Sequence, residues 1–382
     1  MLVPVGLLAA LGVLLALGLL ERRARDAAWR DIPIRIHVNG TRGKSTVTRL
    51  IWSALREAGI PPVAKTTGTS PRLLLPDGTE HAIVRRAPPT IREQLALLRV
   101  ARRHRARAVV VECMALDPEL QWIAEHGMLR STIGVVTNVR PDHTEVMGRD
   151  HATIAATLAN TTPRRGVLVL GDAAAADVFQ HRARQLGSQV ISVADDHARD
   201  GWLAENERIA LAVLRHLHVP DAVAARGFAK VPPDPGAVAS GPLRTPGARW
   251  IDATAANDPV SLGRLMQEHA RTPDGCDDVG RAGAALVIYN HRDDRGPRLA
   301  CFVAHPGVVR EAATLVVTGA RPAWTLWRQV RRRREGRRTL FIPVGALAPW
   351  LAGHASSSDL VFCGNTRGID VRRLLAGAWS RG

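Results

Sequence analysis

The residues whose chemistry is easiest to interpret form one glycine-rich turn that follows an apolar segment. The turn reads Asn39, Gly40, Thr41, Arg42, Gly43, Lys44, Ser45 and Thr46. Its two glycines would let backbone N–H groups close around an oxyanion, and the helix expected after them would add the positive end of its dipole. Lys44 could then reach the terminal phosphates of a nucleotide, and Ser45 could hold a magnesium ion. Val38 stands where the usual Walker pattern has its first glycine, so the turn is a shorter Gly-Thr-x-Gly-Lys-Ser version.

Two further candidate residues follow apolar runs of the kind that form buried strands. Glu112 ends the run 108–112, and His143 comes shortly after the run 133–138. In an open α/β sheet, ligands bind in the crevice at the carboxyl ends of the strands. We therefore expect Glu112 and His143 to converge with Lys44 and Ser45.

The elements that must position these residues alternate between short apolar strands and helices. Strands are expected at 34–38, 108–112, 133–138, 166–170 and 190–193, and helices at 47–58, 88–106, 118–125, 152–160 and 205–217. This alternation is the βαβ rhythm of a parallel sheet.

A proline-rich segment, 231–247, is expected to be a linker because prolines prevent regular structure there. A second α/β unit follows, with strands near 284–289, 315–318 and 339–343. The predicted fold class is α/β: a P-loop-type parallel-sheet ATPase domain over 34–245 and a smaller C-terminal α/β domain over 246–382.

The N-terminus carries an apolar stretch of nineteen residues from Leu2 to Leu20, about enough for a helix to cross a ~30 Å hydrocarbon core. Arginines follow this stretch instead of preceding it, which is untypical of a cleaved signal peptide. The positive-inside rule then predicts a single-pass anchor in the cell (inner) membrane over 1–20, a juxtamembrane link over 21–33, and catalytic domains in the cytoplasm. A buried core helix is the alternative.

The amino-acid composition of the chain limits the binding partners that we expect. The chain has 382 residues, a formal net charge of +17 and four cysteines without paired metal spacing, as expected in a reducing compartment. An arginine run, 328–338, could meet an acidic polymer, anionic lipid or nucleic acid, or could be a solvated helix face. One tyrosine and five phenylalanines supply few stacking surfaces, so nucleic acid is not expected as the partner.

Three motifs together resemble the Mur ligase superfamily of ATP-dependent amide ligases, and within it the poly-γ-glutamate synthase branch. They are Gly40-Thr41-Arg42-Gly43-Lys44-Ser45, Glu112-Cys113-Met114-Ala115 and Thr137-Asn138-Val139-Arg140-Pro141-Asp142-His143. The resemblance is dense over 35–148 and thinner afterwards, with later echoes at 252–259, 290–295 and 363–368.

The resemblance implies ATP and Mg²⁺ as cofactors and an acyl-phosphate intermediate. It implies that residues 39–46 hold the nucleotide phosphates, that Ser45, Glu112 and His143 bind magnesium, and that Asp142 orients the histidine. Asp252 would contact the ribose. Arg292, a phosphate or substrate contact, would join Lys44, Glu112 and His143 as catalytic residues. Segment 154–160 has no lysine where many Mur ligases carry a carbamylated one, which favours the narrower branch.

The branch further implies glutamate and the growing poly-γ-glutamate as substrates, and a hydrophobic membrane subunit as partner in an oligomeric complex. Three alternatives remain open. A folate-type polyglutamate ligase would have no obvious use for a membrane anchor. A membrane-tethered P-loop ATPase acting on a polyanion would need a Walker B strand ending in Asp, where this chain has Glu112. A scaffold would leave Lys44, Glu112 and His143 unexplained.

Overall fold

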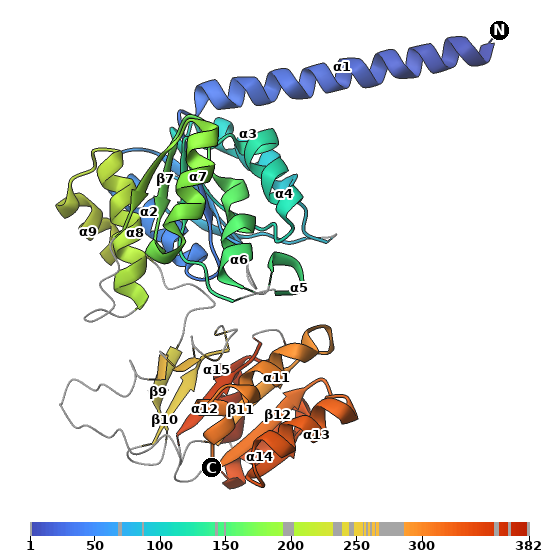
Figure 1. The fold of residues 1–382 in the computed structure, drawn as a ribbon, viewed down its shortest axis with the longest axis vertical. Coiled ribbons are helices and arrows are strands. Elements are labelled where there is room, and N and C mark those ends of the chain that lie inside the picture. Colours follow the sequence, from blue (N-terminus) through green and yellow to red (C-terminus); the bar gives the residue numbers. More distant parts are fainter. Residues whose placement is uncertain are drawn as a thin grey trace. The chain divides into compact units, whose positions relative to one another are not determined.

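The computed structural model describes most of the chain, and it divides into two compact units, Met1–Asp234 and Pro235–Gly382. The described residues are 2–67, 71–85, 88–141, 144–148, 150–193, 202–231, 239–243, 248–254, 256, 259, 262–263, 265–266, 286–354, 359–365 and 368–379. The division lies within the proline-rich segment 231–247. Figure 1 shows both units, each built on a sheet flanked by helices.

The first unit contains an eight-stranded sheet of order β4-β3-β2-β5-β1-β6-β7-β8. Its strands are β1 Ile34–Asn39, β2 Pro62–Lys65, β3 Arg72–Leu74, β4 Glu80–Ala82, β5 Ala108–Glu112, β6 Ile133–Val136, β7 Val167–Leu170 and β8 Gln189–Ser192. All neighbours pair in parallel except at β3 and β4, which form an antiparallel edge. The expected parallel sheet is confirmed, but β2, β3 and β4 were not predicted, because their short runs give little periodic signal.

Helices cover both faces of this sheet. They are α2 Lys44–Glu57, α3 Glu93–Arg103, α4 Pro118–Trp122 with the π-helix Ile123–Leu129, α5 Thr144–Met147, α6 His151–Leu158, α7 Ala176–Leu186, α8 Trp202–His216 and α9 Asp221–Ala229. Successive side chains of β5 pack on opposite faces of the sheet. Val110 packs in the cluster formed with α2 and α8, while Val109 and Val111 pack in the cluster formed with α3.

The N-terminal helix α1 runs without a break from Leu2 to Asp31. Residues 21–31 of the predicted juxtamembrane link, 21–33, continue this helix, whose last turn packs on the domain. Ala28 and Ile32 are buried against α3, in one cluster with Leu97 and Leu98. No helix in the described part of the chain combines the length and hydropathy needed to cross a membrane.

The second unit contains a six-stranded sheet of order β13-β12-β11-β14-β10-β9. Its strands are β9 Ala239–Pro242, β10 Arg249–Asp252, β11 Leu286–His291, β12 Thr314–Gly319, β13 Arg338–Phe341 and β14 Leu360–Cys363, and its helices are α11 Gly296–Ala304, α12 Val308–Glu311, α13 Trp324–Arg333, α14 Val344–His354 and α15 Val371–Trp379. Only β9 pairs antiparallel. This arrangement agrees with the expected second α/β unit.

The arginine run 328–338 is not one uniform surface. Arg328, Arg331, Arg332 and Arg333 are exposed on α13, whereas Arg334 is fully buried. Its guanidinium donates to the backbone carbonyls of Val309, Ala312 and Arg338. A single arginine of the run thus stabilises the packing of its unit, which sequence composition alone did not indicate.

Candidate active site

The glycine-rich turn joins β1 to α2 at the carboxyl edge of the first sheet. Gly40 and Gly43 have φ angles of +120° and +79°, which residues with a side chain rarely adopt. A Cβ at Gly40 would lie 2.1 Å from Thr137 Oγ1 and 2.8 Å from the Thr137 backbone nitrogen. Gly43 caps α2, so the backbone N–H groups of the first helical turn face the end where an anion would bind.

Lys44 is folded back over the turn that it was predicted to serve. Its Nζ donates to the carbonyl oxygens of Gly40 at 2.6 Å and Thr41 at 3.3 Å. These bonds hold the ammonium group beside the N-terminus of α2. A phosphate bound there could replace the carbonyl oxygens as the acceptor without a large movement of the lysine.

Ser45 and Glu112 are brought into direct contact, although they are 67 residues apart. The Ser45 hydroxyl donates to Glu112 Oε2 at 2.8 Å, and the Thr67 backbone N–H donates to the same oxygen at 2.7 Å. Glu112 ends β5 beside β1 and is only 3% exposed. Its carboxylate therefore lies next to the turn as a buried negative charge, with the serine hydroxyl as its nearest side-chain partner.

The segment after β6 braces the turn. Asn138 Oδ1 accepts hydrogen bonds from Thr41 Oγ1 at 2.7 Å and from the Arg42 backbone N–H at 3.1 Å. The Arg140 backbone N–H donates to Thr41 Oγ1 at 2.9 Å. These bonds hold Thr41 and Arg42 of the turn against the segment that follows the neighbouring strand β6.

A buried polar network supports the turn from below, on the face of β1 opposite α2. Asn39 donates through Nδ2 to Gln121 Oε1 at 2.9 Å and to Thr161 Oγ1 at 3.1 Å. Two residues earlier on β1, His37 Nδ1 lies 2.9 Å from Glu125 Oε2, and both side chains are fully buried. Gln121, Thr161 and Glu125 were not predicted as parts of the site.

The His37–Glu125 pair carries charge in the core of the first unit. Burial alone would lower the pKa of His37, but Cys113 and the Glu125 carboxylate raise that pKa to about 10. The other Glu125 oxygen, Oε1, accepts from the Ser131 backbone N–H at 2.8 Å and from its hydroxyl at 2.9 Å. The pair is thus an imidazolium–carboxylate contact that ties β1 to the π-helix.

Two buried residues that were not predicted from the sequence lie near predicted site residues, Asn206 near Gly43 and Lys65 near Glu112. Asn206 of α8 is 3% exposed, and a Cβ added at Gly43 would lie 2.2 Å from its Oδ1. Lys65 ends β2, and its Nζ lies 2.6 Å from Glu93 Oε2. Burial lowers the pKa of Lys65, although Glu93 opposes this. A buried asparagine on the apolar face of the expected helix 205–217 was the available signal for Asn206.

The remaining predicted residues fall into two groups. Thr46 lies in the first turn of α2, whereas Asp142 and His143 lie outside the described residues. Among the described residues, no group of three or more His, Cys, Asp or Glu side chains is placed to hold a metal. Ser45 and Glu112 are therefore the two predicted metal ligands that the described part of the site brings together.

In the second unit, Asp252 ends β10 and Arg292 follows β11, both at the carboxyl edge of the sheet. Asp252 Oδ1 accepts hydrogen bonds from Thr254 N–H at 3.1 Å and from its hydroxyl at 2.6 Å. Arg292 follows β11 and is partly buried. At the same edge, Asn290 and Asn365 exchange hydrogen bonds between side-chain amides and backbone carbonyls, at 2.6 and 2.8 Å.

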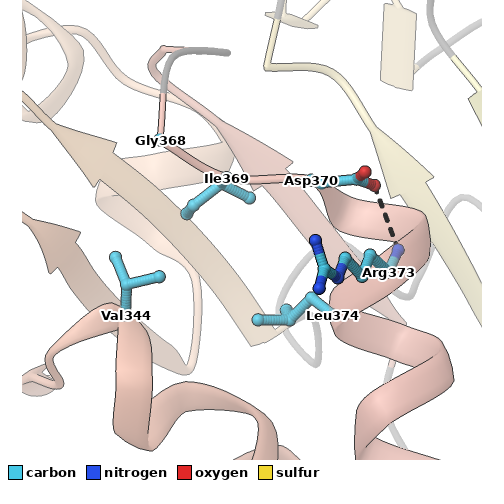
Figure 2. A pocket seen from close by; sticks show the side chains of 6 residues that line it. All are labelled: Val344, Gly368, Ile369, Asp370, Arg373 and Leu374. Atoms are coloured by element: carbon cyan, nitrogen blue, oxygen red, sulfur yellow. Dashed lines mark hydrogen bonds between the residues drawn. The ribbon is translucent and has the colours of Figure 1, made fainter.

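The same unit has a hollow of about 490 Å³ near the beginnings of α14 and α15 (Figure 2). It is lined by Val344, Gly368, Ile369, Asp370, Arg373 and Leu374. In Figure 2 the Asp370 side chain accepts from the Arg373 backbone N–H, at 3.0 Å, as a cap of α15. None of the predicted site residues lines this hollow.

Comparison with known proteins relates both units to one family. The Mur ligase middle domain matches residues 38–212, and the poly-gamma-glutamate synthase CapB C-terminal domain matches residues 242–342. The chain is 34% identical to PGA synthase CapB of Bacillus subtilis (strain 168), covering 82% of this chain and 81% of that protein. The chain belongs to the CapB family of Mur ligases. The predicted family is thereby confirmed, and with it ATP-dependent ligation as the class of activity.

One more curated relative and two solved structures are similar to this CapB-family chain. Capsule biosynthesis protein CapB of Bacillus anthracis is 34% identical over 76% of this chain and 64% of its own length, so the chain spans just under two thirds of that relative. The fold resembles Escherichia coli FolC in complex with ADP, at a TM-score of 0.62 and 18% identity over 90% and 89% of the two chains. It also resembles a Yersinia pestis bifunctional folylpolyglutamate synthase/dihydrofolate synthase with AMPPNP and Mn, at 0.64 and 16%, over 90% of each chain.

Proposed function

We propose that this chain is the ligase of a poly-γ-glutamate synthase, joining glutamates through their γ-carboxyl groups by way of an acyl phosphate. Family membership supports this, because the Bacillus subtilis relative is a PGA synthase. The observation that carries the ATP-dependent step is the contact of Ser45 with Glu112 at 2.8 Å beside the N-terminus of α2.

In this proposal each residue has a task in activating a carboxylate, which is too poor an electrophile at neutral pH for an amine to attack. The N–H groups of the first turn of α2 bind phosphate oxygens, and Lys44 neutralises charge that develops during phosphoryl transfer. Thr41 and Arg42, held by Asn138, keep the turn in this shape. A preorganised cradle of this kind lowers the barrier because it needs little rearrangement during the reaction.

The comparisons support ATP and a divalent metal as the cofactors, and we propose Mg²⁺ as the metal. The Ser45 hydroxyl and the Glu112 carboxylate are hard oxygen donors, the kind that Mg²⁺ prefers, and they already lie in contact. When bound, the ion would neutralise the charge of the triphosphate and the carboxylate. His143 as a further ligand, and Asp252 and Arg292 as nucleotide or substrate contacts, stay predictions.

We further propose that residues 1–20 anchor the enzyme in the cell membrane, with the catalytic units in the cytoplasm. The supports are the apolar stretch Leu2–Leu20, the arginines after it, and the exposure of Leu14 and Leu20 on α1, 66% and 60%. The partner expected there is a hydrophobic membrane subunit in an oligomeric synthase, with the acidic polymer as product.

The test is ligation by the purified full chain in neutral detergent with ATP, Mg²⁺ and D- or L-glutamate, following ADP release and polymer length. We expect ADP, not AMP, and products that a γ-glutamyl hydrolase degrades. The folate-type alternative, favoured by the fold similarity to folylpolyglutamate synthases, is tested by offering a pteroylglutamate as acceptor. Extension of the folate but not of glutamate would refute the proposal.

A further inference from the structure

The junction between α1 and the body of the first unit joins two different surfaces. Figure 1 shows α1 extending away from the rest of the unit, with its C-terminal end on the domain. On the extended part Leu11, Leu14 and Leu20 are 52%, 66% and 60% exposed. At the other end Ala28 and Ile32 are buried in the domain core. An exposed apolar helix thus enters a folded domain over about two helical turns.

A hollow of about 500 Å³ lies at this junction. It is lined by Arg22, Arg25, Asp26, Trp29, Arg30 and Arg130. Four arginines and one aspartate give the lining a net formal charge of +3. Such a surface attracts an anion, and the single acidic residue leaves most of the positive charge uncompensated.

The floor of the hollow is fixed by the domain. The Trp29 indole N–H donates to the Met128 carbonyl at 3.1 Å, which sets the plane of the ring. The Arg130 guanidinium carbon lies 3.9 Å from the ring centroid. The Arg130 carbonyl in turn accepts from Arg35 Nε at 2.8 Å. The ring is therefore held by a bond to Met128, and the Arg130 backbone by a bond from Arg35, while the Arg130 guanidinium lies over the ring.

A second guanidinium shares the same ring and has an unused donor. The Arg25 guanidinium carbon lies 5.2 Å from the Trp29 centroid. Arg25 Nε is buried and has no hydrogen-bond partner within the protein. A buried donor without a partner costs free energy, and two like charges on one ring repel each other. An anion bound in the hollow would relieve both.

We propose that this hollow binds the phosphate headgroup of an anionic phospholipid, with Arg25 and Arg130 as the phosphate contacts. The apolar residues of α1 indicate a lipid source, because Leu20 precedes Arg25 by five residues, a rise of about 7.5 Å along the helix. That spacing puts the arginines at headgroup depth when Leu11 to Leu20 lie among acyl chains. The inference rests on the membrane anchor proposed above.

The test uses the full chain in neutral detergent micelles doped with phosphatidylglycerol or phosphatidylcholine, with retained lipid measured by native mass spectrometry. Wild type should retain phosphatidylglycerol in preference to phosphatidylcholine. The double substitution Arg25→Gln, Arg130→Gln should weaken phosphatidylglycerol binding about 5- to 30-fold and leave phosphatidylcholine unchanged. Arg25→Gln alone, at a side chain whose Nε has no protein partner, should show part of the effect without disturbing the fold.

The matched control is Arg184→Gln with Arg372→Gln, which removes two exposed arginines elsewhere. Equal retention of the two lipids by wild type, or an equal loss in the control, would overturn the headgroup site. Displacement of phosphatidylglycerol by millimolar glycerol phosphate would assign the hollow to a soluble phosphate instead, and would overturn the lipid source. Glutamate ligation in the same micelles is a separate readout, so failure of the lipid site and failure of the proposed enzyme are distinguishable.

Discussion

Replacement of Glu112 by glutamine tests the centre of the proposed site while keeping the size of the side chain. In the structure the carboxylate accepts two hydrogen bonds, from Ser45 at 2.8 Å and from the Thr67 backbone at 2.7 Å. Bonds to a charged acceptor contribute about 1.5–3 kcal/mol and neutral ones about 0.5–1.5. Because the amide oxygen can still accept, we expect a loss of about 2 kcal/mol in the free energy of unfolding, small enough for the domain to fold.

The effect on the metal should be much larger than the effect on stability. Removal of a partner that only orients a metal ligand already costs about 10- to 100-fold in metal affinity. We therefore expect the Mg²⁺ concentration for half-maximal ligation to rise at least that much in Glu112→Gln, with partial recovery of rate at high Mg²⁺. The assay measures the ligation rate against Mg²⁺ concentration at one saturating ATP concentration. The matched control is Glu119→Gln, which removes an exposed carboxylate. A midpoint within twofold of wild type would refute Glu112 as a metal ligand.

Three further outcomes are expected. Lys44→Ala should lower ligation about 10²–10³-fold or more with an unchanged melting temperature, and a rate within a few-fold of wild type would remove the lysine from the phosphate cradle. Gly43→Ala should impair ATP binding, because Gly43 has a φ of +79° and the added Cβ would lie 2.2 Å from Asn206 Oδ1. Adding Asn206→Ala should remove the clash and restore only that part of the lost binding. Full additivity of the two substitutions in a double-mutant cycle would contradict the contact. The pKa of His37 is raised to about 10 in the folded state, so relative to the double variant His37→Gln, Glu125→Gln its stabilisation should be complete below pH 6.5. As pH rises towards 10 that stabilisation should decline by at most about 5 kcal/mol, and a pH-independent difference between chemical denaturation curves would show that His37 is neutral.

Some of the site followed from the sequence because its signals are local. A glycine-rich turn after an apolar run predicts a phosphate cradle, since only a few backbone shapes place N–H groups around an anion. Glu112 was predicted from one topological rule, that the carboxyl ends of parallel strands meet at one edge. The structure puts Glu112 against Ser45 at that edge. The turn, its neighbouring strand and the family can therefore be predicted from the sequence alone.

Other features depended on packing between segments far apart in the chain, which no local pattern encodes. His37 meets Glu125 across 88 residues, and Gly43 meets Asn206 on a helix that could equally have packed elsewhere. Arg334 does not stand out from the other arginines of the run 328–338 in sequence, but it is buried because the backbone carbonyls of Val309 in α12 and Ala312 after it accept its hydrogen bonds. By itself the sequence determined which groups can do the chemistry. Only the tertiary structure decided which of them touch, because burial and pairing of charges depend on how the helices close over the sheet.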